Sequence, residues 1–523
     1  MISALAHVAR LARAAYVLAR EGVFGTVDPA ALPPPAQVMV RMARLIERRG
    51  TRDGARLSRA LTRLGPAYLK LGQFLATRPD VVGAAMAHDL ESLQDRLPPF
   101  PQGEAEAVIA ASLERPLNAI FTRLGPPVAA ASIAQVHHGE VDVAGARRAV
   151  AVKVLRPNVN ARFRRDLSDF FFVARTAEKY SAEARRLRLV EVIATMQRTV
   201  AMEMDLRLEA AALSEMAENT RDDPDFRVPA VDWDRTSHSV LTMEWINGIP
   251  LNDRARLEQT GVDMVDLGAK LIQAFLRHAL RDGFFHADMH PGNLFLDPGG
   301  RLVAVDFGIM GRLGLKERRF LAEILLGFIT RDYIRVAEVH FEAGYVPSHH
   351  SVENFAQAIR AIGEPIHNRI AEDISMAKLL TLLLEVTALF DMRTRPELIL
   401  LQKTMVVVEG VARSFDPKLD IWSTAEPVVR EWIGRNLGPV GKIEGVAAGA
   451  SQLGRVLADI PAIASGAAAA LARFEAMTRE GIVLAPETVA AIARAQAERA
   501  RGRTAALWVL AGAVVAGLLL AIL

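Results

Sequence analysis

The sequence predicts an α+β fold in which two unequal lobes enclose a cleft. Three observations carry this prediction. Residues 1 to about 125 follow helical patterns, extended β-branched patterns gather between about 126 and 250, and almost everything after them is again helical. Strands and helices segregated along a chain are typical of α+β domains. At 523 residues the chain is also too long for one ordinary core, so one large or two domains with appendages are expected.

The strands are predicted from short segments bounded by turn residues. VHHGEVDVAGARRAVAVKVLRP reads as two strands joined by a glycine-containing turn and stopped at Pro157. VPAVDWDRTSHSVLTMEWINGIP supplies two more, ended by Gly248 and Pro250, with a narrow connection near Met243 to Gly248. A last pair, LFLD and RLVAVDF, flanks the turn DPGG.

These patterns divide the chain into five parts. The predicted parts are an N-terminal helical extension (1–125), a small lobe with a helical insertion (126–248), a mostly helical lobe (249–441), alanine-rich helices (442–503) and a membrane span (504–523).

Composition excludes several classes of function. Lys and Arg number 63 against 60 Asp and Glu, so the chain is not basic enough to indicate nucleic-acid binding. There is no cysteine, which excludes disulfides, thiolate catalysis and cysteine-based zinc or iron–sulfur sites.

Both ends of the chain suggest contact with a membrane. Thr504 to Leu523 carry no charge for twenty residues, the length needed to cross a hydrocarbon core of about 30 Å. Arg494, Arg499, Arg501 and Arg503 precede this stretch and favour a cytoplasmic body with a tail anchor. The alternative is a buried hydrophobic hairpin at a partner interface.

The first twenty residues predict an amphipathic helix, since Val8, Leu11, Ala15 and Leu18 share one face. This helix either packs on the body or lies on a membrane surface.

The segment HADMHPGNLFLDPGGRLVAVDFG, residues 286 to 308, concentrates the polar groups of a candidate site. A metal cage of His286 and His290 would need a helix, and Pro291 with Gly292 argue for a loop instead. The order of Asp288, Asn293 five residues on and Asp306 before Phe-Gly is that of a kinase catalytic loop and its metal-binding triplet. Asn293 and Asp306 are therefore predicted Mg²⁺ ligands, and Asp288 would orient or deprotonate an attacking hydroxyl or water.

A lysine upstream completes the candidate nucleotide site. Lys153 lies among apolar residues in VAVKV, where its ammonium needs anionic partners such as the phosphates of ATP or a glutamate. The glycine-rich loop expected before it is replaced by an alanine-rich one, so nucleotide binding should be geometrically altered. The predicted cofactor-binding loop comprises Val128, Ala129, Ala130, Ala131, Ser132, Ile133, Ala134, Gln135 and Val136.

Further motifs identify a family. LKLGQF contains K-x-G-Q as Lys70, Gly72 and Gln73, and EMD gives E-x-D as Glu203 and Asp205. Together with the alanine-rich loop, HADMHPGN and DFG, they make residues 55 to 420 resemble the UbiB/ADCK family of atypical protein-kinase-like proteins.

The resemblance implies a two-lobed protein-kinase-like fold, ATP and Mg²⁺ as cofactors, and a requirement in ubiquinone (coenzyme Q) biosynthesis. It implies that Lys153 pairs with Glu209, and that the helix of Lys70 and Gln73 crosses the nucleotide site to meet Glu203 and Asp205. Asp205 and Glu209 are one helical turn apart, so both could face the cleft.

Two classes of function remain open from the sequence. One is an ATP-dependent enzyme, an ATPase or a kinase of a small molecule or lipid; the other is a nucleotide-gated scaffold for other biosynthetic enzymes. The pattern after DFG predicts a helix at once, without A-P-E or a long activation segment, which argues against a conventional protein kinase. No dinucleotide fingerprint or haem or iron constellation supports a hydroxylase.

The expected partners are membrane lipids, polyprenylated quinone precursors and other ubiquinone-biosynthesis proteins, at the bacterial inner membrane.

Overall fold

The computed structural model describes two compact units. Its described residues are 2–23, 42, 44–47, 56–76, 90, 97–180, 182–364, 386, 389–392 and 396–437. So far as they are described, residues up to Leu97 and from Asn158 to Arg198 form the first unit, and Pro98–Pro157 with Thr199–Lys442 form the second. The insertion after Pro157 thus groups with the N-terminal helices, although it interrupts the lobe in sequence.

The first unit is helical. Its helices are α1 (Ile2–Arg20), α3 (Arg56–Leu64), α4 (Pro66–Ala76), α9 (Val159–Tyr180), α10 (Ala182–Leu187) and the start of α11 (Leu189–Glu203). The predicted first helix is present and packs against α9, where the Arg10 guanidinium donates hydrogen bonds of 2.7 and 2.6 Å to the buried Asp169 carboxylate. Of the two predicted alternatives for this helix, packing on the body is the one that the structure contains. Contact of the helix with a membrane stays a prediction.

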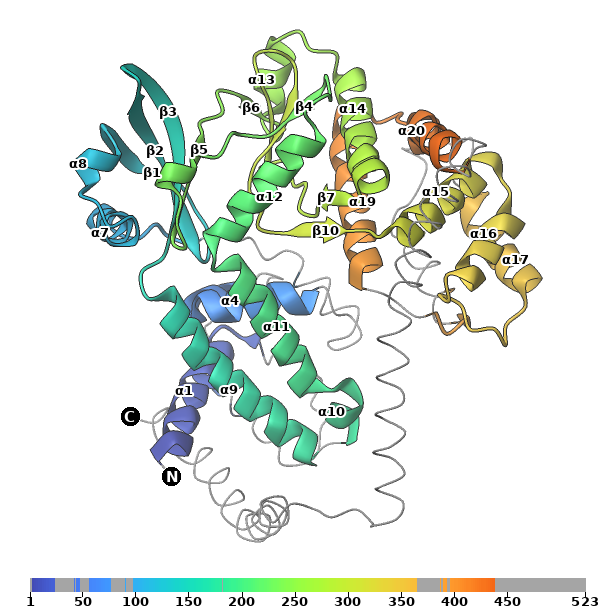
Figure 1. Ribbon diagram of the computed structural model, residues 1–523. Helices are drawn as coiled ribbons and strands as arrows, with labels where there is room; N and C mark the ends of the chain where they lie inside the picture. Colours follow the sequence, from blue (N-terminus) through green and yellow to red (C-terminus); the bar gives the residue numbers. More distant parts are fainter. Residues whose placement is uncertain are drawn as a thin grey trace, which may run out of the picture. The chain divides into compact units, whose positions relative to one another are not determined.

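The second unit begins with a four-stranded antiparallel sheet of order β1-β2-β3-β5, whose strands lie side by side in Figure 1. The strands are β1 (Arg123–Ala130), β2 (Ala134–Val143), β3 (Ala146–Leu155) and β5 (Val240–Glu244). The predicted glycine turn joins β2 to β3: Ala144 and Gly145 have φ of 54° and 81°, and the Asp142 carboxylate accepts a 2.8 Å bond from Gly145 N–H. Such a turn matches the twist of the strands that it connects.

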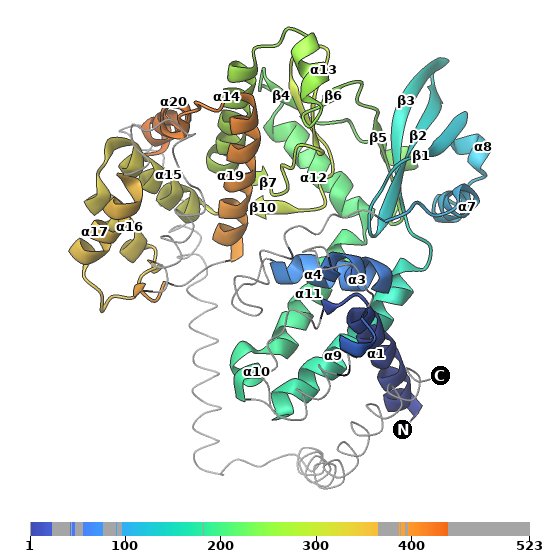
Figure 2. The same cartoon turned by 180° about the vertical axis from the view of Figure 1, so that it is seen from behind.

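The helical extension was predicted to run to residue 125, but the structure divides it earlier. Helices α7 (Gln102–Ser112) and α8 (Leu117–Ile120) lie against the sheet (Figure 2). There Ile109 and Ile120 join a buried cluster with Val152 and other strand residues. β1 is a strand that the sequence analysis missed, because Pro126 and Pro127 cannot donate ladder hydrogen bonds; the pairing of β1 is irregular at this point.

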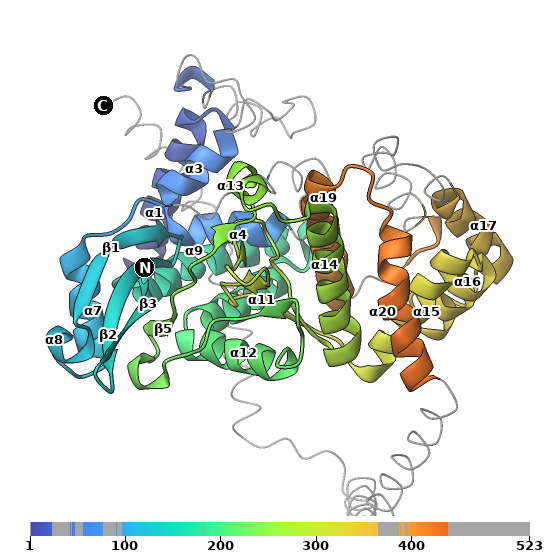
Figure 3. The same cartoon turned by 90° about the horizontal axis from the view of Figure 1, so that it is seen from above.

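The second unit also contains the helices α12 (Leu206–Asn219), α13 (Arg254–Gln259), α14 (Met264–Arg277), α15 (Leu315–Thr330), α16 (Tyr333–Glu342), α17 (Val352–Gly363), α19 (Pro396–Phe415) and α20 (Ile421–Asn436). α14 and α19 lie side by side (Figure 3). Their backbones approach closely at Gly268, where an added Cβ would lie 3.1 Å from the Ala412 carbonyl oxygen.

Short strands pair in the segments between these helices. The predicted pair around DPGG is present as antiparallel β8 (Leu294–Leu296) and β9 (Leu302–Ala304), in a sheet of order β4-β9-β8-β6 with β4 (Phe226–Arg227) and β6 (Ile249–Pro250). β7 (Phe284–His286) pairs with β10 (Met310–Arg312). β10 corrects the expectation that a helix follows DFG at once, since α15 begins only at Leu315.

The α+β class is therefore confirmed. Within the described ranges, no helix has both the length and the apolar character needed to cross a bilayer. The predicted membrane span at 504–523 and the alanine-rich helices at 442–503 lie outside the described residues.

The pH dependence of stability follows from histidines that are buried or partly buried. Burial lowers the pKa of His278, His286 and His340 below the ordinary 6.5. Unfolding restores the ordinary pKa, so below about pH 6.5 the unfolded chain binds more protons than the folded one. The free energy of unfolding therefore decreases as the pH is lowered. We expect the decline between pH 7 and 5 to lessen in His340→Phe, by up to about 1.4 kcal/mol per pH unit.

Urea unfolding at several pH values measures this slope. His238→Gln, a change at an exposed histidine, is the matched control and should keep the wild-type slope. Equal slopes for His340→Phe and the wild type would contradict the assignment.

Candidate functional site

Lys153 lies at the centre of the sheet, with Val136 of β2 and Leu241 of β5 as its neighbours in the ladder. Its side chain is buried, with the residue 8% exposed. The ammonium donates bonds of 2.8 and 3.0 Å to the two oxygens of Glu209 on α12, and a third of 2.8 Å to Asp306 Oδ1. The structure thus contains the Lys153–Glu209 pair that the family resemblance implied.

The electrostatics of this cluster depend on opposed effects. Burial by itself would lower the pKa of the Lys153 ammonium, but the Asp306 and Glu209 carboxylates outweigh burial and raise this pKa above its ordinary range. Lys153 therefore stays charged. Glu209 is only 6% exposed, and burial raises its pKa while Lys153 opposes the rise.

Asn293 and Asp306 come together because of the β8–β9 hairpin. Asn293 directly precedes β8, and Asp306 lies two residues after the end of β9. In an antiparallel pair these two ends lie side by side, and Val305 N–H donates a 2.9 Å bond to the Asn293 carbonyl. Asp306 has a φ of 63°, a left-handed backbone that non-glycine residues seldom adopt outside functional sites or turns. This conformation accompanies the contact of its carboxylate with Lys153.

The same end of the hairpin carries Asp288. The Asn293 side-chain amide donates 3.1 Å bonds to the carbonyl and to the carboxylate of Asp288, which is exposed. Because Nδ2 donates both bonds, Oδ1 is the atom that Asn293 could offer to a cation. With the half-exposed Asp306 carboxylate, it makes an all-oxygen donor set, which fits Mg²⁺.

His286 has a structural part in this loop. Its Nδ1 accepts a 3.0 Å bond from Asp288 N–H, which requires the Nε2-protonated tautomer, and Nε2 donates a 3.1 Å bond to the Val305 carbonyl. Both ring nitrogens are thus occupied, and the ring packs edge-on against Phe307 at 4.9 Å. In this arrangement His286 has no ring nitrogen left to offer to a metal ion.

The alanine-rich loop forms the end of β1, a short connection and the start of β2. None of residues 128–136, all of them described, has a positive φ, so no glycine is required there. Ala131 N–H donates a 2.8 Å bond to the Ala134 carbonyl, and the Arg156 guanidinium donates to the Ala131 carbonyl at 3.1 and 2.8 Å. The Gln135 side chain is buried and bonded to the backbone of Phe100, so only its main chain could face a ligand.

Asp205 and Glu209 do not share a helix face as expected. Asp205 is the N-cap of α12, with φ of −117°, and its carboxylate accepts a bond of 3.1 Å from Arg207 N–H and two from the Arg207 guanidinium. An N-cap residue has non-helical dihedral angles, so its side chain turns back to the helix end. Glu203 is half-buried in the last turn of α11.

Lys70 and Gln73 are half-buried on α4, in the first unit. An amphipathic helix would bury Tyr68, Leu71 and Leu75, yet Ala67, Leu69 and Gly72 are the buried residues, and no residue of α4 is exposed. The prediction that α4 crosses the nucleotide site stays a prediction.

Thr404 is a structural residue of the site that sequence reasoning missed. From the middle of α19 its buried hydroxyl shares its one proton between two acceptors, the carbonyl of Ala287 directly before Asp288 at 3.1 Å and the Leu400 carbonyl at 2.8 Å. A threonine in a helix carries no sequence signal of a contact 117 residues away. The Thr404 hydroxyl therefore holds the loop of Asp288, although Thr404 lies outside the sequence motif of that loop.

A strand lysine paired with a helix glutamate, facing a loop aspartate and asparagine and a DFG aspartate, defines a protein-kinase-like protein. Comparison with known proteins agrees. Residues 92–340 match the ABC1 atypical kinase-like domain and residues 359–420 match the UbiB helical domain.

Two relatives, both named "Probable protein kinase UbiB", come from Marinobacter nauticus and Azotobacter vinelandii. The first is 40% identical over 84% of this chain and 81% of its own length; the second is 39% identical over 76% and 74%. The chain therefore belongs to the UbiB family of atypical kinase-like proteins. A solved complex of Rv3197 with erythromycin from Mycobacterium tuberculosis is 25% identical, covering 78% of this chain and 98% of that one, with a TM-score of 0.47.

The buried ion pair gives a double-mutant prediction. Lys153→Met leaves the Glu209 carboxylate buried without its cation, which should lower the free energy of unfolding by about 3–5 kcal/mol. Lys153→Met with Glu209→Leu replaces the pair by apolar groups and should recover most of this loss. Urea unfolding of both single variants and the double variant measures the coupling, and strictly additive changes would refute it.

The contact from α19 gives a second prediction. Thr404→Val leaves the buried Ala287 carbonyl without this donor and should cost about 1–3 kcal/mol of unfolding free energy. Thr404→Ser keeps the hydroxyl and should be milder. Thr330→Val is the matched control, because Thr330 makes the same 2.8 Å bond one turn back in α15 but is exposed. Similar losses at both threonines would show that the contact with the loop contributes nothing.

Proposed function

We propose that this protein is an ATP-dependent enzyme, an ATPase or a kinase of a small molecule or lipid, that serves ubiquinone biosynthesis at a bacterial membrane. The observation that carries the proposal is the convergence of Lys153, Glu209 and Asp306 within 2.8–3.0 Å hydrogen bonds, beside Asn293 and Asp288. The role in ubiquinone biosynthesis rests on membership of the family.

Each group has a role that its chemistry suits. Lys153, held by Glu209, would neutralise the α- and β-phosphates of ATP. Asn293 and Asp306 would hold Mg²⁺, which neutralises charge on the phosphates when bound. Asp288, exposed at the loop, would accept the proton of an attacking hydroxyl or water. The oxygen of that hydroxyl or water would bond to the γ-phosphorus while the bond between this phosphorus and the ADP oxygen breaks.

The segment after DFG favours a small acceptor over a protein. β10 starts at Met310, two residues after Gly308, and α15 follows from Leu315. A conventional kinase uses a long segment here to hold a peptide. An acceptor that needs no such platform, a lipid or small molecule or water, fits this short connection better.

A tail anchor would bring this site to its substrates. Polyprenylated intermediates dissolve in membranes, and the uncharged stretch 504–523 with arginines before it is suited to hold the body at the cytoplasmic face.

The proposed roles are separated by two variants. Asp306→Asn should weaken binding of Mg²⁺–ATP at least tenfold, since it removes a charged oxygen ligand. Asp288→Asn should keep nucleotide binding but lower turnover about 10²–10⁴-fold, the usual contribution of a catalytic base. A magnesium-dependent thermal-shift titration measures the first effect, and unchanged affinity in Asp306→Asn would remove that residue from the metal site.

Incubation with γ-labelled ATP, Mg²⁺, membranes and quinone precursors identifies the reaction. Label on a lipid or other small acceptor supports the kinase, and free phosphate alone supports the ATPase. Bound nucleotide with neither product would overturn the enzyme and leave the nucleotide-gated scaffold.

A further inference from the structure

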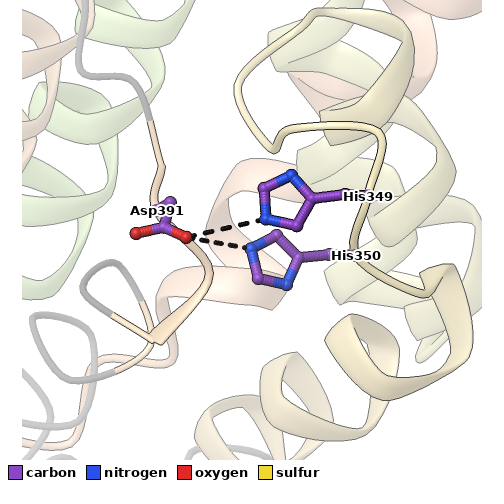
Figure 4. Close-up of side chains that lie close together, drawn as sticks. All are labelled: His349, His350 and Asp391. Atoms are coloured by element: carbon purple, nitrogen blue, oxygen red, sulfur yellow. Dashed lines mark hydrogen bonds and ion pairs between the residues drawn. The ribbon is translucent and has the colours of Figure 1, made fainter.

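A second cluster of cation-binding groups lies outside the nucleotide site. His349 and His350 end the turn before α17, and Asp391 lies on the described segment 389–392 that precedes α19. Their ligand atoms all lie within 4.8 Å of one another. Figure 4 shows both imidazole rings pointing toward the Asp391 carboxylate.

We propose that His349, His350 and Asp391 bind a divalent transition-metal ion, for which Zn²⁺ is the natural probe. The Nε2 atoms of His349 and His350 lie 3.7 and 3.3 Å from one oxygen, Asp391 Oδ2. Around a tetrahedral ion with bonds of about 2.0–2.1 Å, neighbouring ligand atoms lie about 3.3–3.4 Å apart. The two nitrogen–oxygen separations are therefore close to those that a shared ion requires.

Packing anchors the part of this cluster around His350. The ring centroids of His350 and Phe390 lie 5.2 Å apart. Phe390 is buried, and its ring centroid lies 5.0 Å from that of Phe355 on α17. This anchors the residue directly before Asp391, whose φ of 47° is a left-handed conformation that costs energy in a non-glycine residue. Asp391 thus faces the histidines from a left-handed backbone that directly follows a buried residue.

Ion pairing alone accounts poorly for the arrangement. The two rings lie 4.1 Å apart, so protonating both would place like charges side by side opposite a single oxygen. A metal ion instead requires neutral imidazoles and one carboxylate, which is this set of groups.

The donor set selects the kind of ion. Two imidazole nitrogens with one carboxylate suit zinc and its neighbours, whereas Mg²⁺ prefers oxygen ligands such as those of Asn293 and Asp306. The side chains of His349 and Asp391 are 66% and 68% exposed, so an ion can enter and water can complete its coordination. The bound ion would close the 41-residue interval between His350 and Asp391.

The test uses full-length protein purified without a histidine tag and stripped of metal. Calorimetric titration with ZnCl₂, in excess MgCl₂, should give one bound ion per chain. The double variant His349→Gln/His350→Gln and the single variant Asp391→Ala should each bind at least tenfold more weakly. Exposed His238→Gln and the nucleotide-site variant Asp306→Asn are matched controls and should bind zinc as the wild type does.

Two further readouts guard against misfolded variants. Zinc should raise the melting temperature of the wild type but not of the double variant, while both keep the same melting temperature and nucleotide affinity without zinc. Co²⁺ in place of zinc should show the strong visible bands of a four-coordinate ion. Absence of zinc binding, equal binding by the variants, loss of binding in Asp306→Asn, or the weak spectrum of aqueous Co²⁺ would each overturn the site.

Discussion

A buried ammonium organises the second unit of this protein. Lys153 lies in the middle of a sheet where a lone charge would be very costly, and two carboxylates from different parts of the chain make it tolerable. Glu209 comes from α12 and Asp306 from the end of β9, so the same three groups tie sheet, helix and hairpin together. The arrangement that we propose to bind phosphates is thus also a structural junction.

Local spacing made much of the candidate site predictable. Asn293 and Asp306 flank a hairpin whose turn, DPGG, is evident in the sequence, so their proximity follows from strand pairing alone. The pairing of Lys153 with Glu209, 56 residues apart, came only from the family resemblance, because no local rule brings a strand and a distant helix together.

The misses also have physical causes. β1 contains Pro126 and Pro127, which argue against a strand, and the irregular pairing accommodates them. Helical spacing predicted that Asp205 shares a helix face with Glu209. In the structure Asp205 is instead the N-cap of α12, and its carboxylate bonds to the backbone at the start of that helix. The early boundary at Leu97 depends on which apolar faces meet, and a helical pattern does not reveal whether α7 covers a sheet or another helix.

The bond from Thr404 to Ala287 has a practical meaning for anyone dividing this chain into pieces. The kinase-like match stops at residue 340, yet the helix that secures the loop of Asp288 begins 56 positions later, at Pro396. A fragment that ends at residue 340 would lack α19, which packs closely against α14 at Gly268. The kinase-like match alone therefore does not mark where a stable fragment ends, because the loop of Asp288 also needs α19 from the second matched region, residues 359–420.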